Sequence, residues 1–277
     1  MDVSLPDGSS SYPFPDPRGG GRTITVHTHR PATYAPDGPV VVVMHGRNRN
    51  GADYRDWWVE SAESHGALVI APEFTERHYA HPDDYNYGAM FEAGGRPRSQ
   101  SQWLFPVIDQ VFVDACARAG SRAERYFLFG HSAGGQLVHR FATFGWSDRI
   151  ERAVAANAGS YTMPLLDEAF PFGLRGTGFG VAALRALLSR PLLVLLGESD
   201  NDPNHYQLPR EPGAMRQGPH RFARGMHYFE TGRREAARLG VEFGWKVATV
   251  PGIAHSGEFM SPAAAAQLFA AAPITAG

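Results

Sequence analysis

This sequence of 277 residues contains very little cysteine and has no excess of positive charge. The single cysteine, Cys116, excludes an intrachain disulfide and a thiolate metal cluster, and its apolar neighbours predict a small buried side chain. The 26 Lys and Arg residues are balanced by 28 Asp and Glu residues, a formal net charge of -2. Because binding to a phosphate backbone needs clustered excess basic residues, we expect no nucleic-acid partner.

Long apolar runs are also missing. No segment is apolar over the length that crosses a bilayer, and the first ten residues, M-D-V-S-L-P-D-G-S-S, lack the basic and apolar regions of a secretory signal. We therefore expect a cytoplasmic protein without a membrane partner, although a signal removed from a trimmed chain would leave the same sequence. Nothing in the sequence indicates an oligomeric state.

Apolar runs of strand length alternate with segments of helical spacing along most of the chain. Residues 1–21 are rich in Ser, Pro, Asp and Gly, and we expect an extended N-terminal lead-in. Buried strands are predicted at 40–44, 67–72, 126–129, 191–196 and 245–250, with a weaker one at 152–158. Helices are predicted at 53–65, at 101–119 and directly after the strand 126–129. This alternation indicates an α/β fold with a mostly parallel central sheet covered by helices on both faces.

The sequence is organised around R-Y-F-L-F-G-H-S-A-G-G-Q, residues 125–136. An apolar strand runs directly into Gly130-His131-Ser132-Ala133-Gly134, which fits G-x-S-x-G, and helical spacing follows. That context of strand, tight turn and helix is typical of a nucleophile elbow, in which small flanking residues make room for a strained serine. Ser132 is therefore the predicted nucleophile.

Two acidic residues and one histidine follow later strands. The strand 191–196 ends in G-E-S-D-N-D-P, where Asp200 is the preferred acid and Asp202 is the alternative. The last strand leads into P-G-I-A-H-S-G, and a histidine in such a glycine-flanked loop is free to reach a serine. His255 is the predicted general base, and we expect the closing helix to start at Ser261-Pro262.

These motifs give the sequence a clear resemblance. Over residues 22–271 it resembles the α/β-hydrolase superfamily, and most closely its polyhydroxybutyrate-depolymerase and feruloyl-esterase-like branch. The resemblance rests on V-V-V-V-M-H-G-R-N-R-N-G-A-D-Y, A-L-V-I-A-P-E, G-H-S-A-G-G, L-L-G-E-S-D and V-P-G-I-A-H-S. The chain order serine, acid, histidine is the order of that class. Since the motifs extend across the chain, residues 22–277 are expected to form a single domain, with a small cap or loop insertion at 160–190.

The resemblance also implies an oxyanion hole, formed by the backbone N–H groups of Arg47 and Ala133. His45, next to Gly46, is expected to hold that loop. We expect His131, Tyr87, Tyr161 and Arg49 to contact the substrate. Several loop arginines, at 47, 49, 210, 216, 221 and 224, raise the question of an anionic substrate, for which solvated loop charge is the alternative explanation.

The functional hypothesis is a serine hydrolase that cleaves carboxylic esters by way of an acyl-enzyme, without a metal or an organic cofactor. Its substrate would be a small-molecule or oligomeric ester. The same residues acting on an amide would make the protein an amidase or peptidase, which is the main alternative. A non-catalytic binding protein on a hydrolase scaffold is the third hypothesis, because a fold alone does not prove activity.

Overall fold

The computed structural model describes residues 4–92 and 94–269. Its strands are β1 (Gly8–Pro15), β2 (Thr23–Arg30), β3 (Val40–Met44), β4 (Leu68–Glu73), β5 (Tyr126–His131), β6 (Ile150–Ala156), β7 (Leu192–Gly197) and β8 (Lys246–Val250). Its α-helices are α1 (Gly51–Asp56), α2 (Val59–His65), α3 (Phe105–Ala119), α4 (Ala133–Arg140), α5 (Val181–Leu188), α6 (Pro212–Gln217), α7 (Arg221–Leu239) and α8 (Gly257–Leu268). Two short 3₁₀ turns, η1 (Pro82–Asp84) and η2 (Gln100–Gln102), and a π-helical turn, η3 (Phe141–Gly145), complete the elements.

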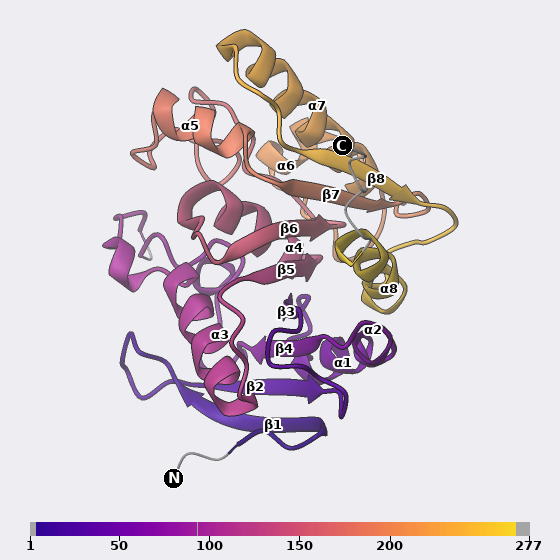
Figure 1. Cartoon of the computed structure of the whole chain (residues 1–277). Coiled ribbons are helices and arrows are strands. Elements are labelled where there is room, and N and C mark those ends of the chain that lie inside the picture. Colours follow the sequence, from indigo (N-terminus) through magenta and orange to yellow (C-terminus); the bar gives the residue numbers. More distant parts are fainter. Residues whose placement is uncertain (1–3, 93, 270–277) are drawn as a thin grey trace.

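The eight strands form one sheet in the order β1-β2-β4-β3-β5-β6-β7-β8 (Figure 1). β1 and β2 pair antiparallel with each other, and β2 pairs antiparallel with β4. The remaining pairs, from β4 through to β8, are all parallel. The sequence-based prediction of a mostly parallel, helix-covered α/β sheet is therefore confirmed.

Both faces of the central strands are buried, which explains their continuous apolar runs. In β3, Val40, Val42 and Met44 contribute to one core cluster, while Val41 and Val43 contribute to the other. The first cluster lies under α3, α4, α5 and α7, and the second lies under α1, α2 and α8. Figure 1 shows the second group of helices on the opposite side of the sheet from α3. The sheet is thus the middle layer of three.

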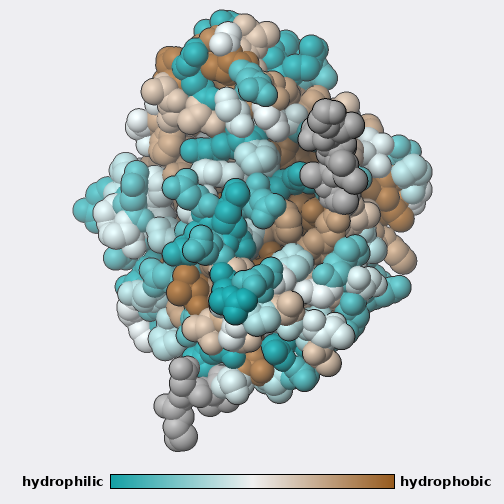
Figure 2. Space-filling model, in the orientation of Figure 1, coloured by the Kyte–Doolittle hydropathy of each residue, from teal (hydrophilic) through white to brown (hydrophobic). Residues whose placement is uncertain are grey.

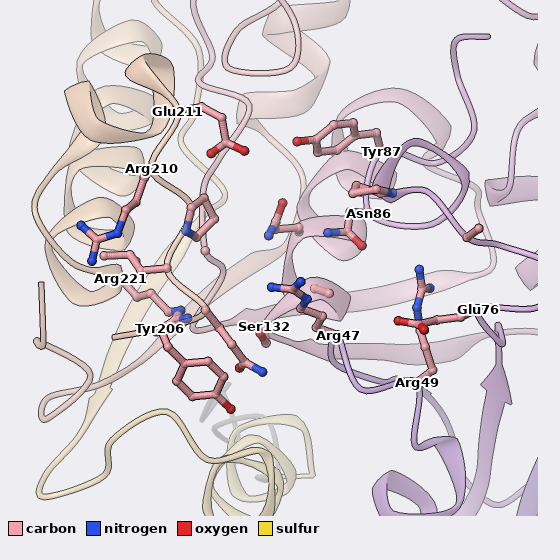
Figure 3. A pocket seen from close by; sticks show the side chains of 18 residues that line it. Arg47, Arg49, Glu76, Asn86, Tyr87, Ser132, Tyr206, Arg210, Glu211 and Arg221 are labelled. Atoms are coloured by element: carbon pink, nitrogen blue, oxygen red, sulfur yellow. The ribbon is translucent and has the colours of Figure 1, made fainter. Parts of the chain in front are cut away.

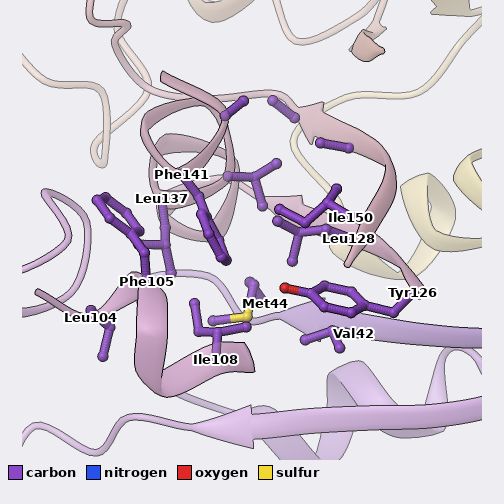
Figure 4. Packing of buried hydrophobic residues seen from close by; sticks show 14 of the residues in the cluster. Val42, Met44, Leu104, Phe105, Ile108, Tyr126, Leu128, Leu137, Phe141 and Ile150 are labelled. Atoms are coloured by element: carbon purple, nitrogen blue, oxygen red, sulfur yellow. The ribbon is translucent and has the colours of Figure 1, made fainter. Parts of the chain in front are cut away.

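The larger cluster fixes the helix that precedes the nucleophile strand. Phe105 and Ile108 of α3 pack toward Leu128 of β5 and toward Leu137 and Phe141, at and just beyond the end of α4 (Figure 4). Phe105 stacks on Phe141 with their ring centroids 5.1 Å apart. Because these side chains are fully buried, each contributes roughly 1.5–3 kcal/mol of hydrophobic stabilisation. This packing holds β5 and α4 rigidly on either side of Ser132.

Two predicted boundaries differ from the structure. Within the expected lead-in 1–21, Gly8–Pro15 is the edge strand β1, paired with β2 along its whole length, because its alternating exposure suits an edge position. The closing helix begins at Gly257 rather than at Ser261-Pro262, because Ser256 caps it by accepting a hydrogen bond from the Phe259 N–H. Pro262 therefore lies inside α8, and the Ser261 hydroxyl bonds to the Gly257 carbonyl one turn earlier.

The face in Figure 2 is mostly polar, with apolar residues in separate small patches. Among the described residues, five large apolar side chains are exposed, and they come from different elements: Val113, Val181, Tyr206, Met215 and Phe259. None of the described helices is long and apolar enough to cross a membrane.

Candidate active site

Ser132 lies on the turn between β5 and α4 with φ 59° and ψ -114°, a strained backbone conformation for a residue with a side chain. The turn is possible because Gly130 and Gly134, two residues before and two residues after Ser132, have no side chains. A Cβ on Gly130 would lie 2.4 Å from the Gly134 carbonyl oxygen, and one on Gly134 would lie 2.2 Å from the Met44 carbonyl oxygen. The local sequence therefore presents the Ser132 hydroxyl at the carboxyl end of the sheet, where the strand ends meet.

Three side chains from distant parts of the chain form one chain of hydrogen bonds. Nε2 of His255 lies 2.9 Å from Oγ of Ser132, and its Nδ1 lies 2.7 Å from Oδ2 of Asp200. The serine follows β5, the acid follows β7 and the histidine follows β8. This arrangement gives the serine a proton acceptor and gives the imidazolium that would form a buried negative partner.

The structure distinguishes between the two candidate acids. Asp200 is 3% exposed and bonds to His255. Asp202 is exposed on the same loop, and its Oδ1 accepts the N–H of Asn204 at 2.8 Å, so it closes a local turn. Asp202 as the partner of His255 is therefore wrong.

Two further residues hold the acid and the histidine loop, and neither was assigned this role from the sequence. Arg221, at the start of α7, donates from Nη1 to Oδ1 of Asp200 at 3.2 Å, and both side chains are almost fully buried. Asn157, at the end of β6, accepts the Gly197 N–H at 2.8 Å and donates to the Ala254 carbonyl at 3.4 Å. A positive charge or an amide in a loop carries no local signal for such long-range contacts.

The electrostatics of the site favour a neutral His255. Burial lowers its pKa below the ordinary value of about 6.5; the hydrogen bond and the negative charge of Asp200 oppose that shift, and the positive charge of Arg221 adds to it. His255 is thus unprotonated at neutral pH, which is the form a general base needs.

His45 connects the loop after β3 to the loop after β4, in line with its predicted role of holding that loop. Its Nδ1 donates to the Gly46 carbonyl at 2.9 Å, and its Nε2 accepts the Phe74 N–H at 2.9 Å. Burial lowers the pKa of His45 to about 3, so the ring stays neutral and keeps this acceptor. The backbone at Gly46 and Arg47 is therefore held close to Ser132.

Ser132 lies where two cavities meet. The larger has a volume of about 520 Å³ and the smaller about 220 Å³, and Arg47, Ser132 and Gln207 border both. Figure 3 shows Ser132 among the residues that line the larger cavity, between Arg47 and Tyr206. This position leaves room for substrate groups on both sides of a bond attacked by Ser132.

The residues predicted to contact substrate have different positions. Tyr87 and Arg49 line the larger cavity (Figure 3). His131 is 3% exposed and lines only the smaller one, where its Nδ1 is 2.9 Å from the Tyr54 hydroxyl. Tyr161 lines neither cavity, and its prediction as a substrate contact is wrong. It is fully buried and stacks on Tyr228, because Gln217 holds its backbone N–H and C=O at 2.8 and 2.7 Å and turns the ring into the core.

The cap or loop insertion expected at 160–190 does not border the larger cavity. Residues 206–211, between β7 and α6, line the larger cavity, whereas no described residue between 160 and 190 does. The helix within 160–190, α5, packs against α7 and η3, away from Ser132. The loop after the acid-bearing strand thus bounds the site.

The chain aligns with the solved structure of LpqC, a poly(3-hydroxybutyrate) depolymerase from Bordetella parapertussis. The match covers 96% of this chain and 90% of that protein, with 42% sequence identity and a TM-score of 0.91. The chain belongs to the depolymerase-like branch of the α/β-hydrolases. It is accordingly a hydrolase.

Other comparisons agree with this family. The hydrolase matches poly(aspartic acid) hydrolase-1 from Sphingomonas sp. KT-1 with 39% identity, a TM-score of 0.90 and coverage of 94% of this chain and 98% of that one. The siderophore hydrolase EstB from Aspergillus nidulans shares only the fold, with 16% identity, a TM-score of 0.60 and 98% coverage of both chains. No protein-family model and no curated protein sequence matches the chain.

Proposed function

We propose that this hydrolase cleaves carboxylic esters by way of an acyl-enzyme, with Ser132 as nucleophile, His255 as general base and acid, and Asp200 as the residue that orients His255. The observation that carries the proposal is the pair of hydrogen bonds, 2.9 and 2.7 Å long, that joins these three side chains beside a cavity. A hydroxyl activated in this way is the arrangement that acyl transfer requires.

In the first half of the reaction, Oγ of Ser132 attacks the acyl carbon while Nε2 of His255 takes the hydroxyl proton. The tetrahedral intermediate collapses, the acyl–oxygen bond breaks, and His255 returns the proton to the departing alcohol. In the second half, His255 removes a proton from water, which attacks the acyl carbon of the acyl-enzyme. The bond between that carbon and Oγ of Ser132 then breaks, His255 returns the proton to Oγ, and the acid is released. Asp200 stabilises the imidazolium at each step without itself taking a proton.

The backbone N–H groups of Arg47 and Ala133 are the proposed donors to the developing oxyanion. Ala133 is the first residue of α4, where an N–H has no acceptor within the helix and the helix dipole is positive. Arg47 follows Gly46, which comes so close to the elbow that a Cβ there would lie 3.7 Å from the Ser132 Cβ. Two such donors are worth roughly 10²–10³-fold each in rate.

Covalent labelling tests the nucleophile. A fluorophosphonate should label the wild-type protein at Ser132, and a Ser132→Ala variant with an unchanged circular dichroism spectrum should take up no label. The wild type should also hydrolyse 4-nitrophenyl butanoate, and the variant should not. Well-folded wild-type protein that forms no adduct would favour the non-catalytic reading instead.

Paired variants test the acid. Asp200→Asn should lower kcat by about 10³–10⁴-fold, because the amide no longer stabilises the imidazolium and favours the wrong tautomer. Asp202→Asn is the matched control, two residues away on the same loop, and should keep kcat within about threefold because surface changes of this kind are usually small. Equal losses in both variants would remove the assigned role of Asp200.

A second candidate is hydrolysis of amides by the same residues. The observation that favours it is the 39% identity to a poly(aspartic acid) hydrolase, since the residues of that polymer are joined by amide bonds. Comparing 4-nitrophenyl butanoate with the butanoic 4-nitroanilide separates the two functions, because the acyl group is the same. An ester hydrolase should show kcat/KM values for the anilide that are lower by orders of magnitude, and comparable values would establish the amide function.

A further inference from the structure

Six charged residues line the larger cavity, and more of them are basic than acidic. They are Arg47, Arg49, Arg210, Arg221, Glu76 and Glu211. Arg216 and Arg224, which the sequence grouped with them, do not line it: Arg216 is exposed and pairs with Glu168, and Arg224 is buried against the Gly159 and Gly218 carbonyls. The cavity therefore has an excess of guanidinium groups over carboxylates.

Most of these guanidinium groups already have a protein partner. Arg221 is paired with the buried Asp200. Arg49, which has φ 58°, donates to the Tyr79 carbonyl at 2.9 Å and stacks on Tyr85 at 4.5 Å. The negative charge of Glu76 also acts on it, and Figure 3 shows the two side by side at one end of the cavity.

At the other end, Arg210 donates to the Pro203 carbonyl at 3.1 Å and is adjacent in sequence to Glu211. Glu211 is directed toward Tyr87, away from Ser132 (Figure 3). The two carboxylates of the lining thus lie apart from the nucleophile, near the ends of the cavity.

Arg47 differs from the others. It is exposed to the cavity beside Ser132, and its guanidinium makes no hydrogen bond or ion pair with any residue in 4–92 or 94–269. A guanidinium presents a planar fork of donors that matches a carboxylate, so an unpaired one next to a nucleophile is suited to bind an acidic group of the substrate.

We propose that Arg47 binds a carboxylate of the substrate, so that the hydrolase prefers acyl compounds with an acidic group close to the bond that is cleaved. This inference rests on the proposed function. Arg47 would then supply two groups to the site: its backbone N–H is the proposed oxyanion donor, and its side chain lines the cavity beside Ser132. A carboxylate held by that side chain would lie in the same cavity as the acyl carbon attacked by Ser132.

Matched esters test the proposal. 4-Nitrophenyl butanoate and the 4-nitrophenyl monoester of succinic acid have acyl chains of the same length. The butanoyl chain ends in a methyl group and the succinyl chain ends in a carboxylate. The measured quantity is the ratio of kcat/KM for the acidic ester to that for the neutral one, taken within each variant. A ratio removes any loss of activity that is common to both substrates.

In the wild type this ratio should exceed one and should fall as NaCl is raised from 50 to 500 mM, because salt screens an exposed ion pair. Arg47→Met should lower the ratio by about tenfold or more and remove its salt dependence, and Arg47→Lys should keep part of both. Arg216→Met, which removes an exposed arginine outside the cavity, should leave the ratio unchanged.

The outcomes separate this inference from the proposed function. If the wild type hydrolyses the neutral ester but Arg47→Met has the wild-type ratio, the carboxylate site is refuted while the esterase stands. If fluorophosphonate does not label Ser132 and neither ester is hydrolysed, the proposed function itself fails. Labelling of Ser132 in Arg47→Met shows that the variant is folded and its nucleophile active.

Discussion

Arg221 lies on the side of the Asp200 carboxylate opposite to His255. It uses Oδ1, at 3.2 Å, and leaves Oδ2 to the histidine, at 2.7 Å. Its other terminal nitrogen, Nη2, is 3.3 Å from Nδ1 of His205. The carboxylate is therefore held in one orientation from both sides, and its buried charge has a buried countercharge.

The pairing of Arg221 with Asp200 leads to a prediction for the pH dependence of kcat/KM. For the wild type, kcat/KM on a neutral ester should rise with pH along a limb centred below about 6.5, because burial lowers the pKa of His255 and only its neutral form accepts the serine proton. Arg221→Met removes a positive charge that lowers this pKa, so the limb should move to higher pH.

Arg221→Lys is the matched variant, because it keeps the charge and should keep the limb near its wild-type position. Loss of one partner from a buried pair costs roughly 3–5 kcal/mol, so unfolding of Arg221→Met must be followed by urea titration beside the kinetics. Superimposable pH profiles of Arg221→Met and the wild type would show that Arg221 does not act on His255.

At the scale of elements, α4 approaches the sheet more closely than any side chain would allow. Gly134 in its first turn lies against the carbonyl oxygens of Met44 and His45, which a Cβ would meet at 2.2 and 2.8 Å. β3 is a central strand with a paired neighbour on each side, so it cannot move away. The position of Ser132 depends on this close contact.

Gly134→Ala should therefore destabilise the protein by about 1–3 kcal/mol or more and reduce fluorophosphonate labelling of Ser132. The control is Gly180→Ala, at the N-cap of α5, where φ is -106° and no atom lies within 4 Å of the added Cβ. We expect that variant to lose at most about 1 kcal/mol and to keep full labelling. Urea unfolding followed by tryptophan fluorescence measures both, and equal stabilities would contradict the proposed close packing.

Across the whole molecule, two buried histidines link loops in the same way. His139 of α4 donates from Nδ1 to the Gly135 carbonyl at 3.0 Å and accepts the Thr162 N–H at Nε2 at 2.9 Å, as His45 does between Gly46 and Phe74. Burial lowers the pKa of both, to about 3 for His45 and well below the ordinary value for His139. A proton on Nε2 would face a backbone N–H and break the link.

The stability of the fold should therefore fall in mild acid. Below pH ~6.5 the unfolded chain binds protons at these histidines and the folded chain does not, so the free energy of unfolding decreases as pH falls, by about 1.4 kcal/mol per pH unit for each histidine. For His45, whose pKa is about 3, this amounts to roughly 2 kcal/mol between pH 7.5 and pH 5, and His139 adds to the loss.

Urea titrations at several pH values measure this loss. His139→Gln should reduce the pH dependence, whereas His65→Gln, which removes an exposed histidine, should leave it unchanged. A free energy of unfolding that is constant from pH 7.5 to pH 5 would contradict the neutral assignment of the buried pair.

Local sequence was enough to predict the parallel strands and the positions of Ser132 and His255 after them, but not the edge strand β1. Parallel strands buried on both faces must be continuously apolar, and the chemistry of this fold follows the strand ends, so runs such as Val40–Met44 and the motif around Ser132 carry a local signal. The glycines at 130 and 134 likewise indicate, from the sequence alone, that the backbone of this turn lies close to neighbouring backbone.

The choice between neighbouring residues in a loop depended on tertiary contacts. Asp200 and Asp202 have the same chemistry two residues apart, and the fold of that turn directs one to His255 and the other to Asn204. The tertiary structure also turned Tyr161 into the core and paired Arg221 with Asp200. The reason is physical: these contacts join segments that no local pattern relates, and their energy exists only once the helices have packed on the sheet.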